Sequence, residues 1–162
     1  MTRLRYYVVI SALIMIFAAG CEENRVYENN VDLPDRNWAE DSVLTFTFEV
    51  KEAGSYDFYY NLRNTLSYPK YNLYLTYSLE DSTGQKLSSE LHEMTLFDPK
   101  TGEPRGNGLG DIFTHRIKAL EGYNLPGPGS YTFRVRQYMR YDTLPEVVSV
   151  GIRVEKAQSG EK

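Results

Sequence analysis

Cys21 is the only cysteine in the chain, and it directly follows Ala18-Ala19-Gly20. Small residues before a cysteine, at the end of an export signal, have the shape of a bacterial lipobox, with Ala18 where leucine is usual. There the signal is cut before the cysteine, whose sulfur receives a diacylglycerol. An exported domain with one cysteine cannot form an internal disulfide, so the thiol needs another role. We therefore predict acylation of Cys21; the alternative is an ordinary cysteine at the end of an uncleaved anchor.

The segment before Cys21 has the features of a secretory signal. Arg3 and Arg5 precede an apolar run from Tyr6 to Ala19, and Gly20 follows. A basic start, a short apolar centre and small residues at the cleavage site are typical of a signal peptide. The run is also near the lower length limit for a membrane-spanning helix, which needs about 20 apolar residues. Residues 1–20 are therefore predicted to be a cleaved lipoprotein signal peptide.

Other residues that could carry chemistry are few. The two histidines, His92 and His115, lie in separate segments without partners at metal-ligand spacing, and His115 is expected on the surface or rim of a strand. The glycine-rich segment 105–110 precedes a strand rather than a helix, so it lacks the helix dipole of a phosphate loop. Close backbone approach or positive φ explains its glycines better, and a calcium site formed by Asp98, Glu103 and Asp111 is a less favoured alternative. We predict no enzyme, no metal and no cofactor.

Large side chains on the outward faces of the predicted strands are the more informative feature. Tyrosine and arginine are the residue types that most often anchor protein interfaces, and they also stack against sugars. Their alternative role is structural, since tyrosine pairs across strands and arginine is readily solvated. The residues expected to form this aromatic and basic patch are Tyr59, Arg63, Tyr74, Arg134, Arg136, Tyr138 and Arg140.

Composition limits the partners and the fold class. The net charge is −4, and removal of residues 1–20 would take away two arginines and no acid. That balance argues against nucleic acid, which favours a basic surface, and against electrostatic attraction to anionic lipid. The 14 tyrosines and 7 phenylalanines, together with valine and threonine, favour strands, whereas amphipathic helical patterns are sparse.

The elements that position these residues are predicted to be strands. In the segment 43–50, apolar residues alternate with polar ones, which indicates a strand with one buried face. Breaks at 81–84 and 125–129 have turn composition. Seven or eight short strands of this kind predict an all-β domain, a single antiparallel β-sandwich of jelly-roll or immunoglobulin-like type. The clearest strands are expected at 43–50, 55–64, 71–80, 93–97, 111–118, 130–140 and 147–155.

The predicted domain organisation follows from these elements. Residues 21–37 are polar and rich in asparagine, and we expect a lipidated tether reaching at most about 50 Å, although Tyr27, Val31 and Leu33 would allow a first edge strand. The sandwich is assigned to residues 38–156. Residues 157–162 are expected to be a disordered tail.

Several segments together resemble the gliding-motility lipoprotein GldH family of Gram-negative bacteria. The most specific features are Arg63-Asn64 followed by Tyr68-Pro69, and Gln137-Tyr138-Met139-Arg140 followed by Leu144-Pro145. Their order and spacing, rather than any one of them, make the match specific. The stretches that carry the resemblance are the lipobox ending in Cys21, 62–75, 106–113, 126–140 and 144–155.

The resemblance implies a cell-envelope lipoprotein required for gliding in motile bacteria and associated with the type IX protein secretion system. It implies no catalytic residue. Only the lipidated Cys21 is carried over directly; the matching tyrosines and arginines are candidates for interaction or structure. Our candidate interaction residues are Arg63, Tyr68, Arg136, Tyr138 and Arg140.

Two functions from different classes remain open at this point. The first is a non-enzymatic accessory component that binds other motility or secretion proteins of the envelope, with the membrane as a partner through the lipid on Cys21. The second is a glycan-binding or nutrient-capture lipoprotein that uses the same exposed aromatics. In either case we expect the outer membrane, on its periplasmic face or on the cell surface.

Overall fold

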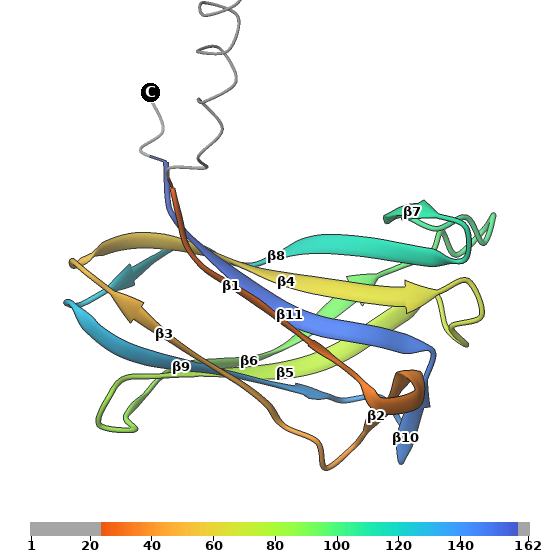
Figure 1. The fold of residues 1–162 in the computed structure, drawn as a ribbon, viewed down its shortest axis with the longest axis horizontal. Helices are drawn as coiled ribbons and strands as arrows, with labels where there is room; N and C mark the ends of the chain where they lie inside the picture. The colour runs from red at the N-terminus through yellow and green to blue at the C-terminus, as the bar shows by residue number, and fades with distance from the viewer. Residues whose placement is uncertain (1–23, 159–162) are drawn as a thin grey trace, which may run out of the picture.

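A computed structural model of the chain describes residues 24–158, and the predicted signal peptide, Cys21 and the last four residues lie outside that range. The described part is an antiparallel β-sandwich, as predicted (Figure 1). One sheet has five strands in the order β1-β11-β4-β8-β7, and the other has four in the order β3-β9-β5-β6. A two-stranded ribbon of β2 and β10 completes the fold.

The elements of the two sheets and the ribbon have the following bounds. The five-stranded sheet contains β1 (Arg25–Asp32), β11 (Val147–Lys156), β4 (Gly54–Thr65), β8 (Ile112–Leu125) and β7 (Asn107–Leu109). The four-stranded sheet contains β3 (Leu44–Val50), β9 (Gly129–Gln137), β5 (Asn72–Glu80) and β6 (Lys86–Thr95). The ribbon contains β2 (Asn37–Ala39) and β10 (Thr143–Pro145), and a short 3-10 helix, η2 (Pro34–Arg36), leads from β1 into it.

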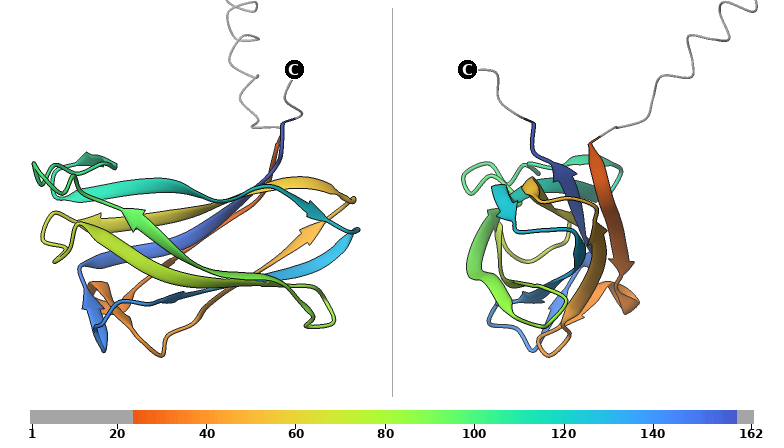
Figure 2. Two further views of the ribbon diagram at one scale, coloured as in Figure 1. Left: turned by 180° about the vertical axis from the view of Figure 1, so that it is seen from behind. Right: turned by 90° about the vertical axis from the view of Figure 1, so that its left-hand side faces the viewer.

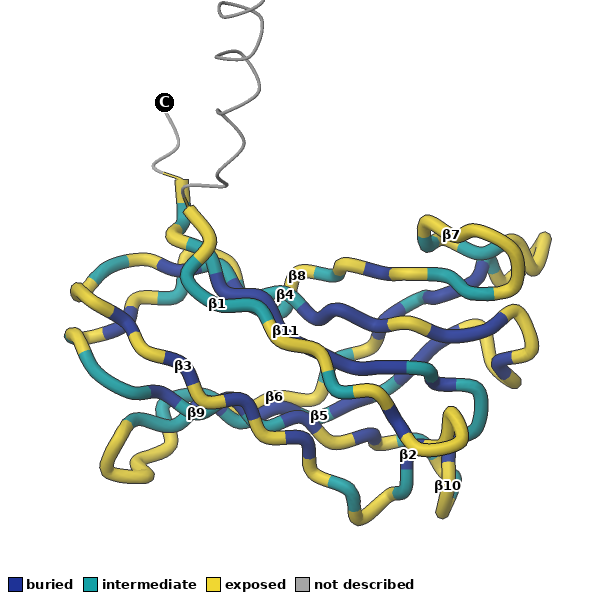
Figure 3. The backbone as a smooth tube through the Cα atoms, viewed as in Figure 1, coloured by how far each residue is buried: buried dark blue, intermediate teal, exposed yellow. Residues whose placement is uncertain are grey.

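The core lies between the sheets and is made largely of aromatic rings. Phe133 on β9 is fully buried and stacks on Tyr77 of β5, with ring centroids 5.1 Å apart, and on Phe58 of β4 at 5.5 Å. The alternating residues expected to point inward on β3, β4 and β5 are buried, which gives the banded pattern of Figure 3. Stacked and edge-to-face rings of this kind join the two sheets across their interface.

The ordered domain begins earlier than the sequence predicted. Residues 25–32 were assigned to the tether, with a first edge strand as the alternative. The structure has that strand: β1 pairs with β11 from Arg25–Glu155 to Asp32–Ser149. Only Glu22, Glu23 and Asn24 then separate Cys21 from the first strand.

Other strand bounds also differ from the prediction. The strand expected at 130–140 ends at Gln137, and residues 138–142 form a connection to β10. The strands expected at 93–97 and 111–118 are the longer β6 and β8. On β11 the pairing register shifts between Val147 and Ser149, and Val147 is buried while Val148 is half-buried.

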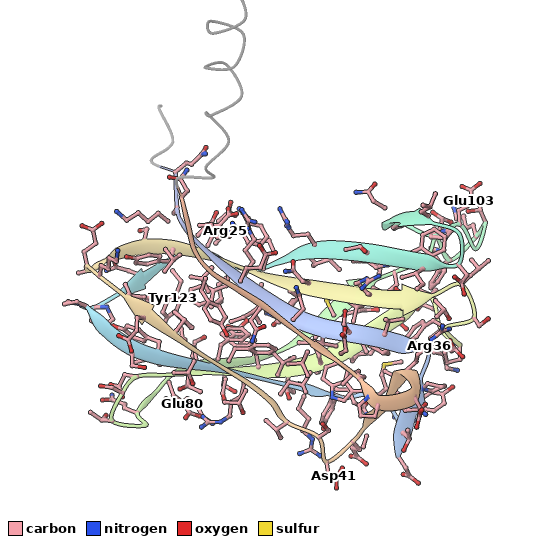
Figure 4. All side chains as sticks on the ribbon, in the orientation of Figure 1. Arg25, Arg36, Asp41, Glu80, Glu103 and Tyr123 are labelled. Atoms are coloured by element: carbon pink, nitrogen blue, oxygen red, sulfur yellow. The ribbon has the colours of Figure 1, made fainter. Side chains whose placement is uncertain are left out.

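The strand directions define two ends of the sandwich. One end, where the chain enters the domain after Cys21, is called the tether end; it contains the start of β1, the end of β11 and the turn between β3 and β4. At the far end lie the β2–β10 ribbon, the loop between β4 and β5, and the β7–β8 hairpin (Figures 1 and 2). Figure 4 shows Arg25 at the tether end, with Arg36 and Glu103 at the far end.

Candidate interaction surface

A turn formed by residues 138–141, where the chain passes from β9 towards β10, presents large side chains at the far end. Gln137, the last residue of β9, is fully buried and holds this turn from inside. Its Oε1 accepts a hydrogen bond from the Met139 backbone N–H at 2.7 Å, and its Nε2 donates to the Tyr141 carbonyl at 2.8 Å. One buried amide therefore fixes two points of the turn.

Neighbouring strands fix the turn from the other side. The backbone N–H of Tyr138 donates to the Tyr74 carbonyl on β5 at 2.8 Å. The Tyr74 N–H in turn donates to the Met139 sulfur at 3.2 Å. On the ribbon side, the Glu40 N–H donates to the Asp142 carbonyl at 2.8 Å. The backbone of the turn is thus held by the sheet and the ribbon, even though the side chains of Tyr138 and Arg140 are exposed.

The ribbon that receives the turn is itself anchored in the core. Trp38 of β2 and Leu144 of β10 face each other in the register, and both are fully buried. The indole N–H of Trp38 donates to the Ser42 carbonyl at 3.1 Å. The connection from β9 to β10 therefore starts at one buried residue, Gln137, and leads to another, Leu144.

Two hollows lie on either side of the turn. The larger is a groove of about 620 Å³ on the outer side of β5 and β6. A second hollow, of about 510 Å³, lies towards the β2–β3 connection. The groove is lined by Lys70, Asn72, Tyr74, Leu91, Tyr138, Met139, Arg140 and Tyr141. The second hollow is lined by Glu40, Asp142 and the same four turn residues.

The groove combines exposed apolar groups with charges at its rim. Tyr138 is 60% exposed and Leu91 is 51% exposed, both high for large apolar side chains. The Lys70 ammonium lies 5.9 Å from the centre of the Tyr141 ring, within reach of a cation–π interaction. Within the described residues, Arg140 has no hydrogen bond or ion pair. Tyrosine, methionine and arginine are enriched in protein interfaces, so the groove has the composition of a docking site.

Two of the predicted interaction residues, Tyr138 and Arg140, lie in this groove, and Arg136 lies next to it. Arg136 Nε donates to the Glu40 carbonyl at 2.8 Å, and its Nη2 lies 3.5 Å from Glu40 Oε1. Arg136 therefore holds the β2–β3 connection beside the second hollow, and only part of its guanidinium faces solvent.

Tyr68, one of the candidate interaction residues, has a buried and structural position. It is only 6% exposed. Its hydroxyl donates to the Asn72 carbonyl at 3.0 Å, and its ring is parallel to that of Phe97, with centroids 6.4 Å apart. Tyr68 thus shapes the β4–β5 loop that brings Lys70 and Asn72 to the groove, and it cannot itself present its ring to a partner.

Arg63 lies on the opposite face of the sandwich, so the predicted patch is divided. Arg63 and Tyr59 are on the outer side of β4 in the five-stranded sheet, whereas Tyr74, Arg136 and Tyr138 belong to the four-stranded side. Arg63 borders a polar hollow of about 360 Å³ that also includes Asp32 and Arg116.

The polar face around Arg63 contains an ionic network centred on Glu28. The Glu28 carboxylate lies 3.0 Å from Arg153, which is only 4% exposed, and it accepts a bond from Asn61 Nδ2 at 2.9 Å. Burial by itself would raise the pKa of Glu28, but the hydrogen bonds from Arg25 and Asn61 and the charge of Arg153 leave that pKa below its usual value. This network ties β1 to β11 and β4 and so has a structural role.

The glycine-rich segment and the histidines have structural positions too. A Cβ on Gly106 would lie 2.7 Å from the Thr114 carbonyl and 2.8 Å from the His115 ring, so the close approach predicted for these glycines is confirmed. His115 is buried, only 5% exposed, rather than on the surface as expected. His92 Nδ1 lies 3.1 Å from the Tyr60 hydroxyl.

The carboxylate of Asp98, the less favoured candidate for a calcium ligand, is hydrogen-bonded within a turn. Its carboxylate accepts bonds from the backbone N–H groups of Lys100 and Thr101 and from Arg105. Between residues 24 and 158, no group of three or more histidine, cysteine, aspartate or glutamate side chains is placed to hold a metal ion. Over the same residues, no helix is long and apolar enough to cross a membrane.

Sequence reasoning missed several residues of the surface. Lys70, Leu91 and Tyr141 belong to the groove, and Glu40 and Asp142 belong to the hollow beside it. The sequence contained one signal of this surface, Gln137. It is a polar residue at a position that strand alternation places on the inward face. A buried amide needs partners, and a nearby turn is where a strand-terminal glutamine finds them.

The described residues thus form a β-sandwich with an exposed groove that contains tyrosine and arginine. A sequence model described as "GldH lipoprotein" matches residues 25–154, and the chain belongs to this family. The chain is 27% identical, over 158 residues, to the gliding motility lipoprotein GldH of Flavobacterium johnsoniae. The alignment covers 92% of this chain and 94% of that protein.

Among solved structures, the similarities are weak. The infectious bursal disease virus VP2 subviral particle matches with a TM-score of 0.44 and 11% identity, over 84% of this chain and 33% of VP2. An arabinose-bound α-L-arabinofuranosidase matches with a TM-score of 0.37 and 10% identity, over 78% of this chain and 18% of the enzyme. The chain thus spans a third or less of these proteins, and similarities at this level support no functional argument.

Proposed function

We propose that this chain is a lipid-anchored protein of the cell envelope that acts without catalysis, as an accessory component of gliding motility and the associated type IX protein secretion machinery. It docks another envelope protein in the groove at the far end of the sandwich. Family membership supports the lipoprotein and motility parts of this proposal. The groove supports docking.

The observation that carries the docking role is the way buried Gln137 holds the turn. Immobilising a side chain or loop on binding costs about 0.5–1.5 kcal/mol for each rotamer-rich side chain. In this turn the backbone is already fixed by Gln137 and Tyr74, while Tyr138 remains 60% exposed. A partner would therefore meet a preformed surface rather than a loop it must order.

The anchor restricts where such a partner lies. Cys21, the proposed lipidation site, is four residues before Arg25, so their Cα atoms can be at most about 14 Å apart. The predicted tether of residues 21–37 would have allowed a much wider search. Attachment this short raises the local concentration of the domain near membrane-bound partners. We place the protein at the outer membrane, on its periplasmic face or at the cell surface.

Complementation of a deletion strain tests the proposal, with the secreted proteome and gliding as readouts. The double variant Tyr138→Ala, Arg140→Glu should lose both, because it removes the exposed ring and reverses the charge at the groove. The matched control is Tyr59→Ala, Arg63→Glu, which makes the same changes on β4 at the opposite face. Full complementation by the groove variant, with folded protein in the envelope, would contradict docking there.

Capture of partners separates docking from glycan binding. In crosslinked envelopes the wild-type chain should retain motility or secretion proteins and the groove variant should not. Binding to a glycan array, with no protein partner captured, would instead support the glycan-capture alternative. Cys21→Ala should release the protein from the membrane fraction and abolish labelling with palmitate.

A further inference from the structure

The tether end of the sandwich is fixed to the start of the described chain by hydrogen bonds. The Lys156 N–H donates to the Asn24 carbonyl at 2.8 Å, and the Ala157 N–H donates to the Ser55 carbonyl at 2.9 Å. Arg25 is already paired with Glu155 in the sheet. These bonds hold the Asn24 backbone directly against the domain, and β1 and β11 lie side by side at this end (Figure 1).

A shallow hollow of about 300 Å³ opens at the same end, and its residues come from β1, the β3–β4 turn and β11. Lys51 in the turn is exposed and has no hydrogen bond or ion pair within residues 24–158. Lys156 is paired with Glu52, and Arg25 with Glu28. The residues that line the hollow are Asn24, Arg25, Val26, Glu49, Lys51, Glu52, Tyr56 and Lys156.

We infer that the tether end is a membrane-contacting surface, and that its hollow takes the phosphate groups of lipid headgroups. This inference rests on the proposed lipidation of Cys21. With the diacylglycerol in the bilayer, Arg25 lies within about 14 Å of Cys21. The attachment therefore holds the tether end close to the membrane, and a contact of this end with headgroups would set the sandwich upright.

The charge distribution fits this orientation. The chain carries a net charge of −4, so its surface as a whole gives no attraction to phosphate. At the hollow, however, Arg25 and Lys156 are paired with Glu28 and Glu52, whereas Lys51 in the exposed turn has no such partner among the described residues. Lysine amines near a membrane surface are attracted to anionic lipid within about a Debye length. The lipid supplies the anchoring and these cations supply the orientation.

The orientation has a direct consequence for the groove. The ten residues of β11 span roughly 30 Å from the far end to the tether end. The turn at residues 138–141 joins the ribbon at the far end, so the groove, on the outer side of β5 and β6, lies at the end remote from the membrane that holds the lipid. Its partner therefore approaches from the aqueous side.

Short-range fluorescence quenching tests the orientation. The lipidated full chain is purified and reconstituted in vesicles of phosphatidylethanolamine with a minority of phosphatidylglycerol, doped with a headgroup-attached quencher. The acylated Cys21 sulfur cannot react, so an introduced thiol is the only label site. Ala53→Cys labels the exposed β3–β4 turn, and Leu109→Cys labels the far-end hairpin, where Leu109 is 94% exposed. We expect several-fold stronger quenching at position 53.

The possible outcomes separate this inference from the proposed function. Equal quenching of the two labels in vesicle-bound protein would overturn the orientation and leave lipidation intact. A chain that stays in the supernatant and carries no lipid mass would overturn the proposed anchoring, and the inference with it.

A charge variant tests the phosphate contact. Lys51→Glu should weaken quenching at position 53, whereas Lys100→Glu, which changes another exposed lysine, at the far end, should not. Identical quenching in the two variants would overturn the role of the hollow in binding phosphate. Sedimentation with vesicles and mass spectrometry of the lipid serve as controls for every variant.

Discussion

The two ends of this sandwich are built differently although the same strands run between them. At the far end, an exposed turn rests on the buried side chains of Gln137, Trp38 and Leu144. At the tether end, exposed lysines and glutamates are joined by pairs such as Lys156–Glu52. The first construction fixes the backbone of the turn, as the proposed docking would require. The second presents charges on an exposed surface, which would suit the proposed contact with lipid headgroups.

The largest effect is expected from a change in the core that both ends of the sandwich share. Phe133→Ala removes the ring that stacks on Tyr77 and Phe58. A buried phenylalanine replaced by alanine costs about 3–5 kcal/mol, so both ends should lose stability together. Denaturant unfolding followed by circular dichroism measures this. A loss of no more than about 0.5 kcal/mol, which is typical of surface changes, would show that the sheets are not joined through this ring.

The next largest effect should be confined to the far end. Gln137→Ala leaves the Tyr141 carbonyl and the Met139 N–H without their buried partner, at a cost of about 1–3 kcal/mol. The turn should also loosen, so partner capture should fall by more than the loss of stability explains. Gln85→Ala, in an exposed turn, is the control and should change neither property. Wild-type capture by the Gln137 variant would show that the turn does not need this amide.

Crowding at the β7–β8 hairpin gives a related test of the far end. Gly106→Ala places a methyl group 2.7–2.8 Å from the Thr114 carbonyl and the His115 ring, and such overpacking costs about 1–3 kcal/mol. Gly127→Ala, which meets no atom within 4 Å, should be neutral. Thermal unfolding of the pair measures the difference. Equal melting temperatures would contradict the close approach of β7 to β8.

Acid should weaken the far end through His115. Burial lowers the pKa of His115 below its usual value of 6.5, so the folded state binds its proton less readily than the unfolded state does. Stability from this group is therefore complete above about pH 6.5 and falls as the pH drops towards the folded pKa. In the His115→Gln variant, the melting temperature should change less between neutral pH and pH 5 than it does in the wild type. An unchanged slope would show that other groups set the pH dependence.

The smallest effect is expected at the tether end. Lys156→Gln removes the partner of Glu52 on an exposed surface, where ion pairs contribute little. The melting temperature should not change measurably, in contrast to the Gln137 variant. A loss as large as that of Gln137→Ala would mean that the tether end is also a rigid construction.

Much of the fold could be predicted because the alternation is regular where one face is buried. Leu44, Phe46 and Phe48 alternate with polar residues on β3, and the same pattern gave β4 and β5. The order of the segments also indicated the family. These signals depend only on which side of a strand is apolar, which the sequence shows directly.

β1 was harder to predict because it has no such pattern. Its residues are exposed or half-buried, so alternation is weak. Its place in the sheet depends on Gly151, where a side chain would collide with Asn29 and Asn30. That dependence links positions far apart in the sequence, and no local pattern reports it.

The candidate site was predicted only in part for a similar reason. Alternation correctly placed Tyr138 on an outward face, but it does not say which sheet that face belongs to. Arg63 was therefore grouped with residues on the opposite side of the molecule. Tyr68 follows a strand in a loop, where alternation gives no orientation, and its burial depends on contacts with Phe97 and Asn72.

The central claim, docking at the groove, is tested most directly by photo-crosslinking in living cells. A photoreactive amino acid replaces Tyr138 in one strain and exposed Lys86, on the edge strand β6, in another. Docking at the groove should give a discrete crosslinked envelope protein from position 138, lost when Gln137→Ala is added, and none from position 86. Crosslinks that are the same from both positions, or absent from position 138 in a strain that still glides and secretes, would contradict it.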